Sequence, residues 1–340
     1  MTTNDHDVNT EKHVPLSLID FATVFKGETS REAFLRSVEQ AQLAERLGYS
    51  RIWYSEHHNM SSIASSAPAV LISHIAAKTD SIRLGSGGVM LPNHSPLVIA
   101  EQYGTLAELY PGRIDLGVGR APGTDQRTVM ALRRDPRSAE SFPEDVRELQ
   151  GYLAGRSRVP GVTAIPGTDT HVPVYVLGSS LFGAKLAAQL GIPYSFASHF
   201  APDALKEAVS VYRQTYQPSK EHPEPYVIAA VNVTTADTEA EALAQSEKVR
   251  RARVETMALR GRKVSEEDLD LLMSSPAADQ ILSMLKYSAV GTGEQVREYL
   301  EGFTATAQAD ELMVAIQSPS TEGSLRAMEI LADSWGLSRP

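Results

Sequence analysis

Eight short β-rich segments alternate with longer helical patterns along most of the chain, and this alternation limits the possible folds more than any other feature. Strands that alternate with helices form parallel sheets, and eight is the number that closes a barrel. We therefore predict an α/β fold, a (β/α)8 TIM barrel. The predicted strands are Leu16–Ile19, Arg51–Ser55, Ile82–Met90, Ile114–Val118, Val172–Leu177, Tyr194–Ala197, Tyr226–Val233 and Leu312–Ile316.

Several helix ends can be predicted from single residues. Thr29 and Glu32 have the spacing of a capping box, and Gly48 is expected to end the helix that they begin. Pro68 and Pro96 suit the first positions of two further helices.

The interval between the seventh and eighth predicted strands, roughly Ala258–Val290, is longer than one crossover helix requires. It is rich in charged residues and methionine, and we interpret it as an insertion over the barrel mouth. Residues 1–13 are polar and predict a disordered tail, whereas 14–340 predict a single barrel domain.

Composition excludes several classes of protein. A net charge of −10 argues against general affinity for nucleic acids or anionic membranes, since both favour clustered cations. The absence of cysteine excludes disulfides and thiolate catalysis, and no apolar run approaches the roughly 20 residues that span a bilayer. We expect a soluble cytoplasmic protein that binds neither nucleic acid nor membrane.

The residues just after each strand are the candidates for chemistry, because the active sites of such barrels lie at the carboxyl ends of the strands. Glu56-His57-His58-Asn59 follows the second strand. Neighbouring side chains on an extended chain point to opposite sides, so His57 and His58 are poorly placed to share a metal ion. We expect no metal; a structural role and proton transfer near neutral pH are the readings that stay open.

Glycine-rich segments follow the third and fourth strands. The run that contains Gly87 and Gly88 indicates either tight packing or the close approach of a flat ring. Gly117-Val118-Gly119-Arg120-Ala121-Pro122-Gly123 only weakly resembles a dinucleotide motif, but an arginine at a strand exit suits a phosphate.

Small and polar residues follow the next three strands. Gly178, Ser179 and Ser180 precede a helix, where they favour either N-capping or a phosphate site. Ser198 and His199 follow the sixth strand, and the seventh ends near Asn232. Together with His58, these last three residues are expected to line a substrate pocket.

As a set, these segments resemble the bacterial luciferase-like monooxygenase family, in its single-chain branch, from about Pro15 to Leu337. The motifs that carry the resemblance are Glu56-His57-His58, Leu84–Pro92, Tyr110–Gly119 with Arg120, Gly178-Ser179-Ser180, Phe196–Phe200 and Gly291-Thr292.

The resemblance implies a barrel that binds FMN at the strand ends, with His57 as the catalytic residue. It places a cis peptide between Gly87 and Gly88 beneath the flavin ring, and Arg120 and Ser179 at the flavin phosphate. The full set of expected cofactor contacts is Gly87, Gly88, Gly119, Arg120, Pro122, Gly178, Ser179 and Ser180. Gly119 stands where luciferase has a reactive cysteine, so light emission is not expected.

The implied reaction uses reduced FMN, supplied by a separate flavin reductase, and oxygen to oxidise a small organic substrate through a flavin 4a-hydroperoxide. Three alternatives are a deazaflavin-dependent dehydrogenase, a non-catalytic flavin-binding homologue and a metal-dependent barrel hydrolase. The family also implies a homodimer. Leu71, Ile75, Val98 and Leu106 either offer an apolar face for pairing or pack on the barrel.

Overall fold

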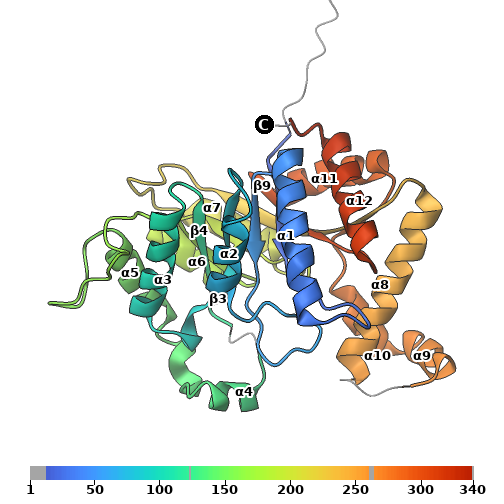
Figure 1. Ribbon diagram of the computed structural model, residues 1–340, viewed down its shortest axis with the longest axis horizontal. Helices are drawn as coiled ribbons and strands as arrows, with labels where there is room; N and C mark the ends of the chain where they lie inside the picture. The colour runs from blue at the N-terminus through green and yellow to red at the C-terminus, as the bar shows by residue number, and fades with distance from the viewer. Residues whose placement is uncertain (1–12, 122–123, 260–263, 339–340) are drawn as a thin grey trace, which may run out of the picture.

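The structure, a computed structural model, describes residues 13–121, 124–259 and 264–338. Its strands form one parallel sheet in the order β6-β5-β4-β3-β2-β1-β9-β7-β8, and a further pairing of β6 with β7 closes the ring, leaving only β8 outside it (Figure 1). The predicted (β/α)8 barrel is confirmed. The strands are β1 Leu16–Asp20, β2 Arg51–Tyr54, β3 Arg83–Met90, β4 Ile114–Gly119, β5 Val174–Gly178, β6 Tyr194–Phe196, β7 Val227–Thr235, β8 Ser288–Gly291 and β9 Glu311–Ile316.

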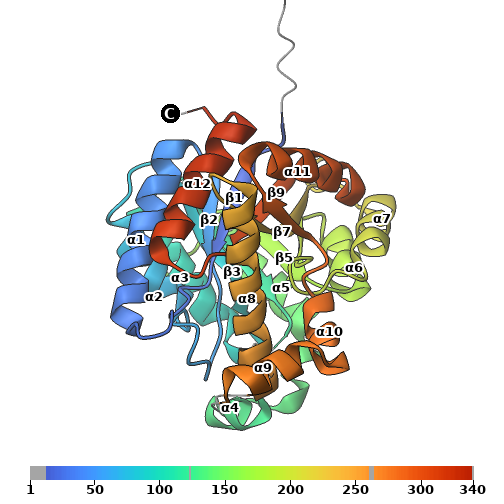
Figure 2. The same ribbon diagram turned by 90° about the vertical axis from the view of Figure 1, so that its right-hand side faces the viewer.

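Helices surround the strands in both views (Figures 1 and 2). They are α1 Ser30–Leu47, α2 Pro68–Ala76, α3 Pro96–Leu109, α4 Gln126–Ala131, α5 Phe142–Leu153, α6 Leu181–Leu190, α7 Leu205–Thr215, α8 Glu239–Leu259, α9 Glu266–Met273, α10 Pro276–Ser283, α11 Gly293–Ala307 and α12 Thr321–Trp335. None of the helices in the described ranges combines the length and the apolar character that a membrane span requires.

The helix ends follow the predicted chemistry. The Thr29 backbone N–H donates to Glu32 Oε2 at 2.7 Å, and the Glu32 N–H donates to Thr29 Oγ1 at 3.3 Å, so the capping box is formed. Gly48 ends α1 in the left-handed conformation at φ 86°. Pro68 and Pro96 each occupy the first turn of a helix, as predicted.

The insertion between the seventh and eighth barrel strands is also confirmed, with a correction at its end. Its helices α9 and α10 lie at the same end of the molecule as α4, which follows the carboxyl end of β4 (Figure 1). Part of the segment assigned to the insertion instead forms β8, which pairs with Asn232–Thr235 of β7. The four residues of β8 show no clear hydrophobic period, so no sequence pattern indicated this strand.

The ends and the outer face of the barrel bear on two further predictions. Of the predicted tail, only His13 is described, and its ring packs 4.4 Å from that of Trp335. Leu71, Ile75 and Leu106 are buried within the chain, whereas Val98 is 43% exposed. Most of the apolar face suggested for pairing therefore packs on the barrel, and the homodimer stays a prediction.

A charged network fills the barrel interior around Arg51. Arg51 Nη1 lies 2.7 Å from Asp115 Oδ2, and its Nε lies 2.9 Å from Glu311 Oε1, within ion-pair distance but not aligned for a hydrogen bond. Both carboxylate side chains are fully buried. Tyr226 and Ser17 donate their hydroxyls to Glu311 at 2.8 Å and 2.5 Å, so neighbouring strands are linked across the interior.

An apolar layer packs inside the barrel with this network. It is connected to the network by Trp53, whose Nε1 donates to Asp115 Oδ2 at 3.2 Å. The layer consists of Ile19, Trp53, Tyr175, Ile228, Ala230, Met313 and Ala315.

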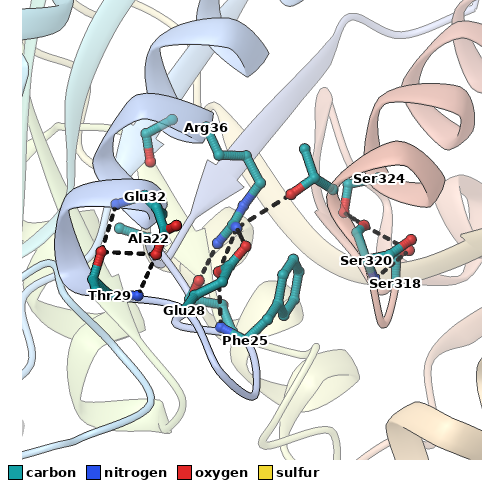
Figure 3. Close-up of polar contacts among 12 residues, drawn as sticks. Ala22, Phe25, Glu28, Thr29, Glu32, Arg36, Ser318, Ser320 and Ser324 are labelled. Atoms are coloured by element: carbon teal, nitrogen blue, oxygen red, sulfur yellow. Dashed lines mark hydrogen bonds and ion pairs between the residues drawn. The ribbon is translucent and has the colours of Figure 1, made fainter.

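The loops after the first and last barrel strands are joined by Arg36 of α1 (Figure 3). Its guanidinium contacts the Glu28 carboxylate at 2.7 Å and the Thr23 carbonyl, and it lies 3.4 Å from Thr321 Oγ1 at the start of α12. This buried arginine therefore holds the loop after β1 against α12, beside the pairing of β1 with β9.

Replacing Arg51 with methionine should strongly destabilise the protein. The change removes the cationic partner of buried Glu311 and one of the two cationic partners of buried Asp115, which also pairs with Arg83. Breaking a buried ion pair in this way costs about 3–5 kcal/mol in comparable cases. Urea unfolding of the wild type and of Arg51→Met measures the difference in the free energy of unfolding.

Arg297→Met is the control, because Arg297 pairs with Glu301 at 3.7 Å on the exposed face of α11. We expect it to change the free energy of unfolding by less than about 1 kcal/mol. Equal effects of the two substitutions would contradict a structural role for the Arg51 network.

Candidate functional site

His57 follows β2 at the carboxyl end of the barrel. Its backbone N–H donates to the Ser65 carbonyl at 2.9 Å, and its Nδ1 lies 3.2 Å from Ser55 Oγ. Burial lowers the pKa of His57, and the nearby Glu56 carboxylate only partly opposes this shift. His57 is therefore mainly neutral at pH 7, with Nε2 available to exchange a proton.

Glu56 gives the next histidine the opposite character. Its buried Oε1 lies 2.9 Å from His58 Nε2 and 2.8 Å from His94 Nε2, and its Oε2 accepts from the Met90 N–H at 3.1 Å. Burial alone would raise the pKa of Glu56, but these histidine contacts lower it to about 2. The hydrogen bond to Glu56 in turn raises the pKa of His58, against the effect of burial.

The two adjacent histidines thus have separate partners, Ser55 for His57 and Glu56 for His58. In the described part of the chain, no group of three or more histidine or carboxylate side chains is arranged to hold a metal ion.

A cavity of about 290 Å³ opens beside the histidines. The loops after β2 and β4 meet around it: Asn59 Nδ2 donates to Asp125 Oδ2 at 3.1 Å, and Thr124 Oγ1 donates to the His58 carbonyl at 3.0 Å. Its lining residues are His57, His58, Asn59, Met60, Thr124 and Asp125. The expected cofactor contact Pro122 lies outside the described residues.

The glycine pair of β3 contains the expected cis peptide between Gly87 and Gly88. The strand changes register between Ser86 and Val89, as a bulge would. A Cβ on Gly88 would lie 2.9 Å from the Gly117 carbonyl oxygen, and a Cβ on Gly87 would lie 2.9 Å from Ile19 Cδ1. Side chains here would collide with the strand beside and with the layer below, so tight packing accounts for at least part of the need for glycine.

Arg120 and the start of α6 come together after β4 and β5. The Arg120 guanidinium carbon lies 4.1 Å from the ring centroid of Phe182, the second residue of α6. Ser180 is the N-cap residue, yet its hydroxyl caps no backbone N–H. The Ser179 hydroxyl likewise has no hydrogen-bond partner among the described residues. Ordinary capping therefore does not account for the two serines.

The neighbouring glycines have different surroundings. A Cβ on Gly119 would meet nothing closer than Met90 Sδ at 3.6 Å, so packing does not require glycine there. Gly178 faces Gly183, with a Cβ on the first lying 3.6 Å from Cα of the second. The absence of side chains at this pair brings α6 close to the end of β5.

Ser198, His199 and Asn232, predicted to line a substrate pocket with His58, are all buried, and the cavity described above is lined by His58 but by none of these three. Ser198 donates its hydroxyl to the Ala230 carbonyl at 2.5 Å, so that hydroxyl is engaged in the barrel wall. Asn232 Nδ2 donates to the His199 carbonyl at 2.7 Å. His199 Nδ1 and Asn232 Oδ1 are left without a partner within the described structure.

His199 is neutral at pH 7. Burial is the main cause that lowers its pKa, to about 3, and the positive charge of Arg253 and, when it is protonated, of His57 acts in the same direction. The ring centroid of Phe21 lies 5.9 Å from that of His199 and 6.0 Å from that of His57. Phe21 therefore connects the two histidines across the mouth.

Sequence reasoning missed several of these residues. Phe21 directly follows β1, so inspection of the residues after each strand could have identified it. His94, Phe182 and Arg253 lie on a loop or on helices, and their roles depend on contacts with residues far away in the sequence.

Comparisons with known proteins agree with this arrangement. A model of the luciferase-like monooxygenase family matches residues 16–309. The chain is 45% identical over 330 residues to the "Luciferase-like monooxygenase" of Escherichia coli K12, covering 95% of this chain and 98% of that one. The chain belongs to the luciferase-like monooxygenase family.

Two further relatives support the assignment. The N-acetyl-S-alkylcysteine monooxygenase of Bacillus subtilis is 32% identical, with 94% of this chain and 98% of that one covered. The crystal structure of apo-MsnO8 is 34% identical and has a TM-score of 0.86, with 97% and 99% of the two chains covered.

More distant structures share the barrel and differ in cofactor. The oxygenating constituent of 3,6-diketocamphane monooxygenase from Pseudomonas putida, solved in complex with FMN, has a TM-score of 0.71 at 16% identity, over 95% of this chain and 98% of that one. A secondary alcohol dehydrogenase that depends on coenzyme F420 has a TM-score of 0.68 at 15% identity, over 93% and 98%. At these identities the likeness concerns the fold alone.

Replacing Glu56 with glutamine should lower the pKa of His58, because the carboxylate that favours the protonated ring is removed. NMR titration of ring-labelled histidines measures this shift. In the wild type, the raised pKa means that the His58–Glu56 contact stabilises the fold at pH values below the ordinary histidine pKa. This contribution is lost as the pH rises through the pKa of the folded state.

Ser55→Ala is the control, since Ser55 contacts His57 and not His58. A His58 titration that does not change in Glu56→Gln would contradict the electrostatic coupling described above.

Proposed function

We propose that the chain is a monooxygenase that uses reduced FMN and oxygen to oxidise a small organic substrate. One observation carries the proposal: four adjacent barrel strands present, in order, His57, the Gly87-Gly88 pair, Arg120 and the Ser179-Ser180 helix start. In the proposed reaction, these residues would serve in that order as a proton-exchanging group, a surface without side chains and an anion site along one rim of the barrel.

The residues at this rim fit a flavin phosphate. Arg120 has no ion pair with any described residue and is oriented by Phe182 beside a helix start that lacks a side-chain cap. Free N–H groups at a helix start, serine hydroxyls and a guanidinium are all donors that bind phosphate. Reduced flavin bound here would supply the electrons for oxygen activation.

The protein's own residues would control protons and water. Because Nδ1 of His57 faces Ser55, Nε2 is the atom that would hold or release a proton. Because the pKa values of His57 and His199 are lowered, both rings are mainly neutral at pH 7 and contribute no positive charge to the reaction site. The apolar ring of Phe21 lies between His57 and His199, which favours exclusion of water from this part of the rim.

The comparisons support this proposal at the level of the family. Relatives that cover nearly the full chain have names that describe monooxygenases, and one distant structure holds FMN. Another distant structure depends on coenzyme F420, a deazaflavin, so a deazaflavin is the alternative cofactor. A separate flavin reductase and a cytoplasmic location complete the proposal.

Replacing Arg120 with methionine should weaken FMN binding by roughly tenfold to a hundredfold, since a hydrogen bond to a charged group contributes about 1.5–3 kcal/mol. Riboflavin lacks the phosphate, so its weaker binding should be unaffected. Quenching of flavin fluorescence measures both affinities.

Arg127→Met is the matched control, because Arg127 lies on α4, is exposed and carries the same charge. Equal loss of riboflavin and FMN binding in Arg120→Met would contradict a phosphate contact. Titration with a deazaflavin tests the alternative cofactor, and binding of the deazaflavin in preference to FMN would overturn the proposal.

Replacing His57 with alanine should leave FMN affinity largely unchanged but reduce product formation by roughly a hundredfold or more, the usual contribution of a general acid or base. More of the consumed oxygen should then leave as hydrogen peroxide. A panel of organic sulfides and ketones, assayed with a flavin reductase, NADH and FMN, measures organic product and peroxide separately.

His74→Ala serves as the control, because His74 is an exposed residue of α2. If His57→Ala converts oxygen to organic product as efficiently as the wild type, His57 has no part in the reaction.

A further inference from the structure

Three hydrogen-bond contacts join His57, Ser55 and Ser65 in a closed cycle. The Ser65 hydroxyl donates to the Ser55 carbonyl at 2.6 Å, and the His57 backbone N–H donates to the Ser65 carbonyl at 2.9 Å. The Ser55 hydroxyl oxygen lies 3.2 Å from His57 Nδ1. Both serines are only 1% exposed, so water does not compete for the contacts that hold the histidine in place after β2.

The Ser55 hydroxyl has His57 Nδ1 as its single hydrogen-bond partner in the part of the chain that the structure describes. The backbone of Ser55 is engaged elsewhere, since its N–H donates to the Asp20 carbonyl at 3.2 Å and its carbonyl accepts from Ser65. A serine hydroxyl carries one proton, and a buried donor without an acceptor is unfavourable. The hydroxyl proton of Ser55 is therefore expected to point to His57 Nδ1.

This direction of donation determines which nitrogen of His57 carries the ring proton. In a neutral imidazole, one nitrogen is an N–H donor and the other has a free lone pair. His57 is mainly neutral at pH 7 because burial lowers its pKa. If Nδ1 accepts from Ser55, its lone pair is in use and the proton is on Nε2.

The opposite tautomer would leave a buried donor without a partner. With the proton on Nδ1, the ring would donate to Ser55 Oγ, and the Ser55 hydroxyl proton would then find no acceptor among the described residues. With the proton on Nε2, no group is left unpaired in this way. The His57 ring lines the cavity beside the histidines, where an Nε2–H can reach water or a ligand.

We propose that Ser55 is a positioning residue that fixes His57 as the Nε2–H tautomer, so that His57 acts on the ligand in the cavity as a hydrogen-bond donor. The chemical meaning of this inference rests on the proposed function, because it concerns the histidine of the same site. A neutral imidazole N–H can polarise a bound oxygen atom. The ligand atom that faces His57 should accordingly be an acceptor, such as an oxygen with a free lone pair.

NMR of the wild-type protein without flavin tests the tautomer directly. The histidine rings are labelled with ¹⁵N, and spectra are recorded above the ordinary histidine pKa. A protonated ring nitrogen and one with a free lone pair have well-separated ¹⁵N chemical shifts. We expect His57 to show a protonated Nε2 and an unprotonated Nδ1, and His57→Ala assigns the signals because they are missing from its spectrum.

Substitutions of the two serines separate positioning from general effects on the fold. Ser55→Ala removes the donor to Nδ1, and the ratio of the Nδ1–H to the Nε2–H tautomer should rise roughly tenfold. Ser55→Thr keeps a hydroxyl and should restore the wild-type ratio. Ser65→Ala is the matched control, because it removes another hydroxyl of the same cycle that does not contact the ring, and it should leave the ratio unchanged.

A wild-type spectrum with the proton on Nδ1 would overturn the inference. An unchanged ratio in Ser55→Ala, or an equal change in Ser65→Ala, would contradict the role of the Ser55 hydroxyl. The wild-type spectrum decides the tautomer even if Ser55→Ala does not fold. Because these measurements contain no flavin, failure of the wild type to bind FMN would contradict the proposed function alone.

Discussion

The placement of Arg51 between Asp115 and Glu311 supports the surface on which the site is built. Two carboxylates without water require a cation, and Arg51 brings strands from both halves of the ring to the same point. Asp115 also accepts from Trp53, and the Trp53 side chain lies directly beneath Gly87. A charged contact in the interior thus holds the side chain that packs beneath the Gly87-Gly88 pair.

Glu56 organises the rim in a similar way. One buried carboxylate accepts from His58, His94 and the backbone of β3, and it leaves His57 outside this set of contacts. Two adjacent residues of one type consequently differ in proton affinity, because one is paired with a carboxylate and the other faces a hydroxyl. The division of roles comes from hydrogen-bond partners and not from residue type.

Much of this architecture could be predicted from the chain alone. Alternating strands and helices predicted the barrel, Thr29 and Gly48 predicted the bounds of α1, and the glycine pair was recognised through a family resemblance. Strand β8 was missed because its four residues are too few to show a clear hydrophobic period. The stacking of Arg120 on Phe182 depends on the distance between separate elements, which no local pattern contains.

Helix α4 is held to the barrel by hydrogen bonds of its preceding loop and not by buried side chains of its own. None of its side chains is buried, and the loop before it is held to the histidine loop by the Asn59–Asp125 and Thr124–His58 hydrogen bonds. Evolution can therefore lengthen, shorten or replace this segment without disturbing the interior of the barrel. One wall of the cavity can therefore change in length and sequence without a change in the packing of the strands that carry His57 and the glycine pair.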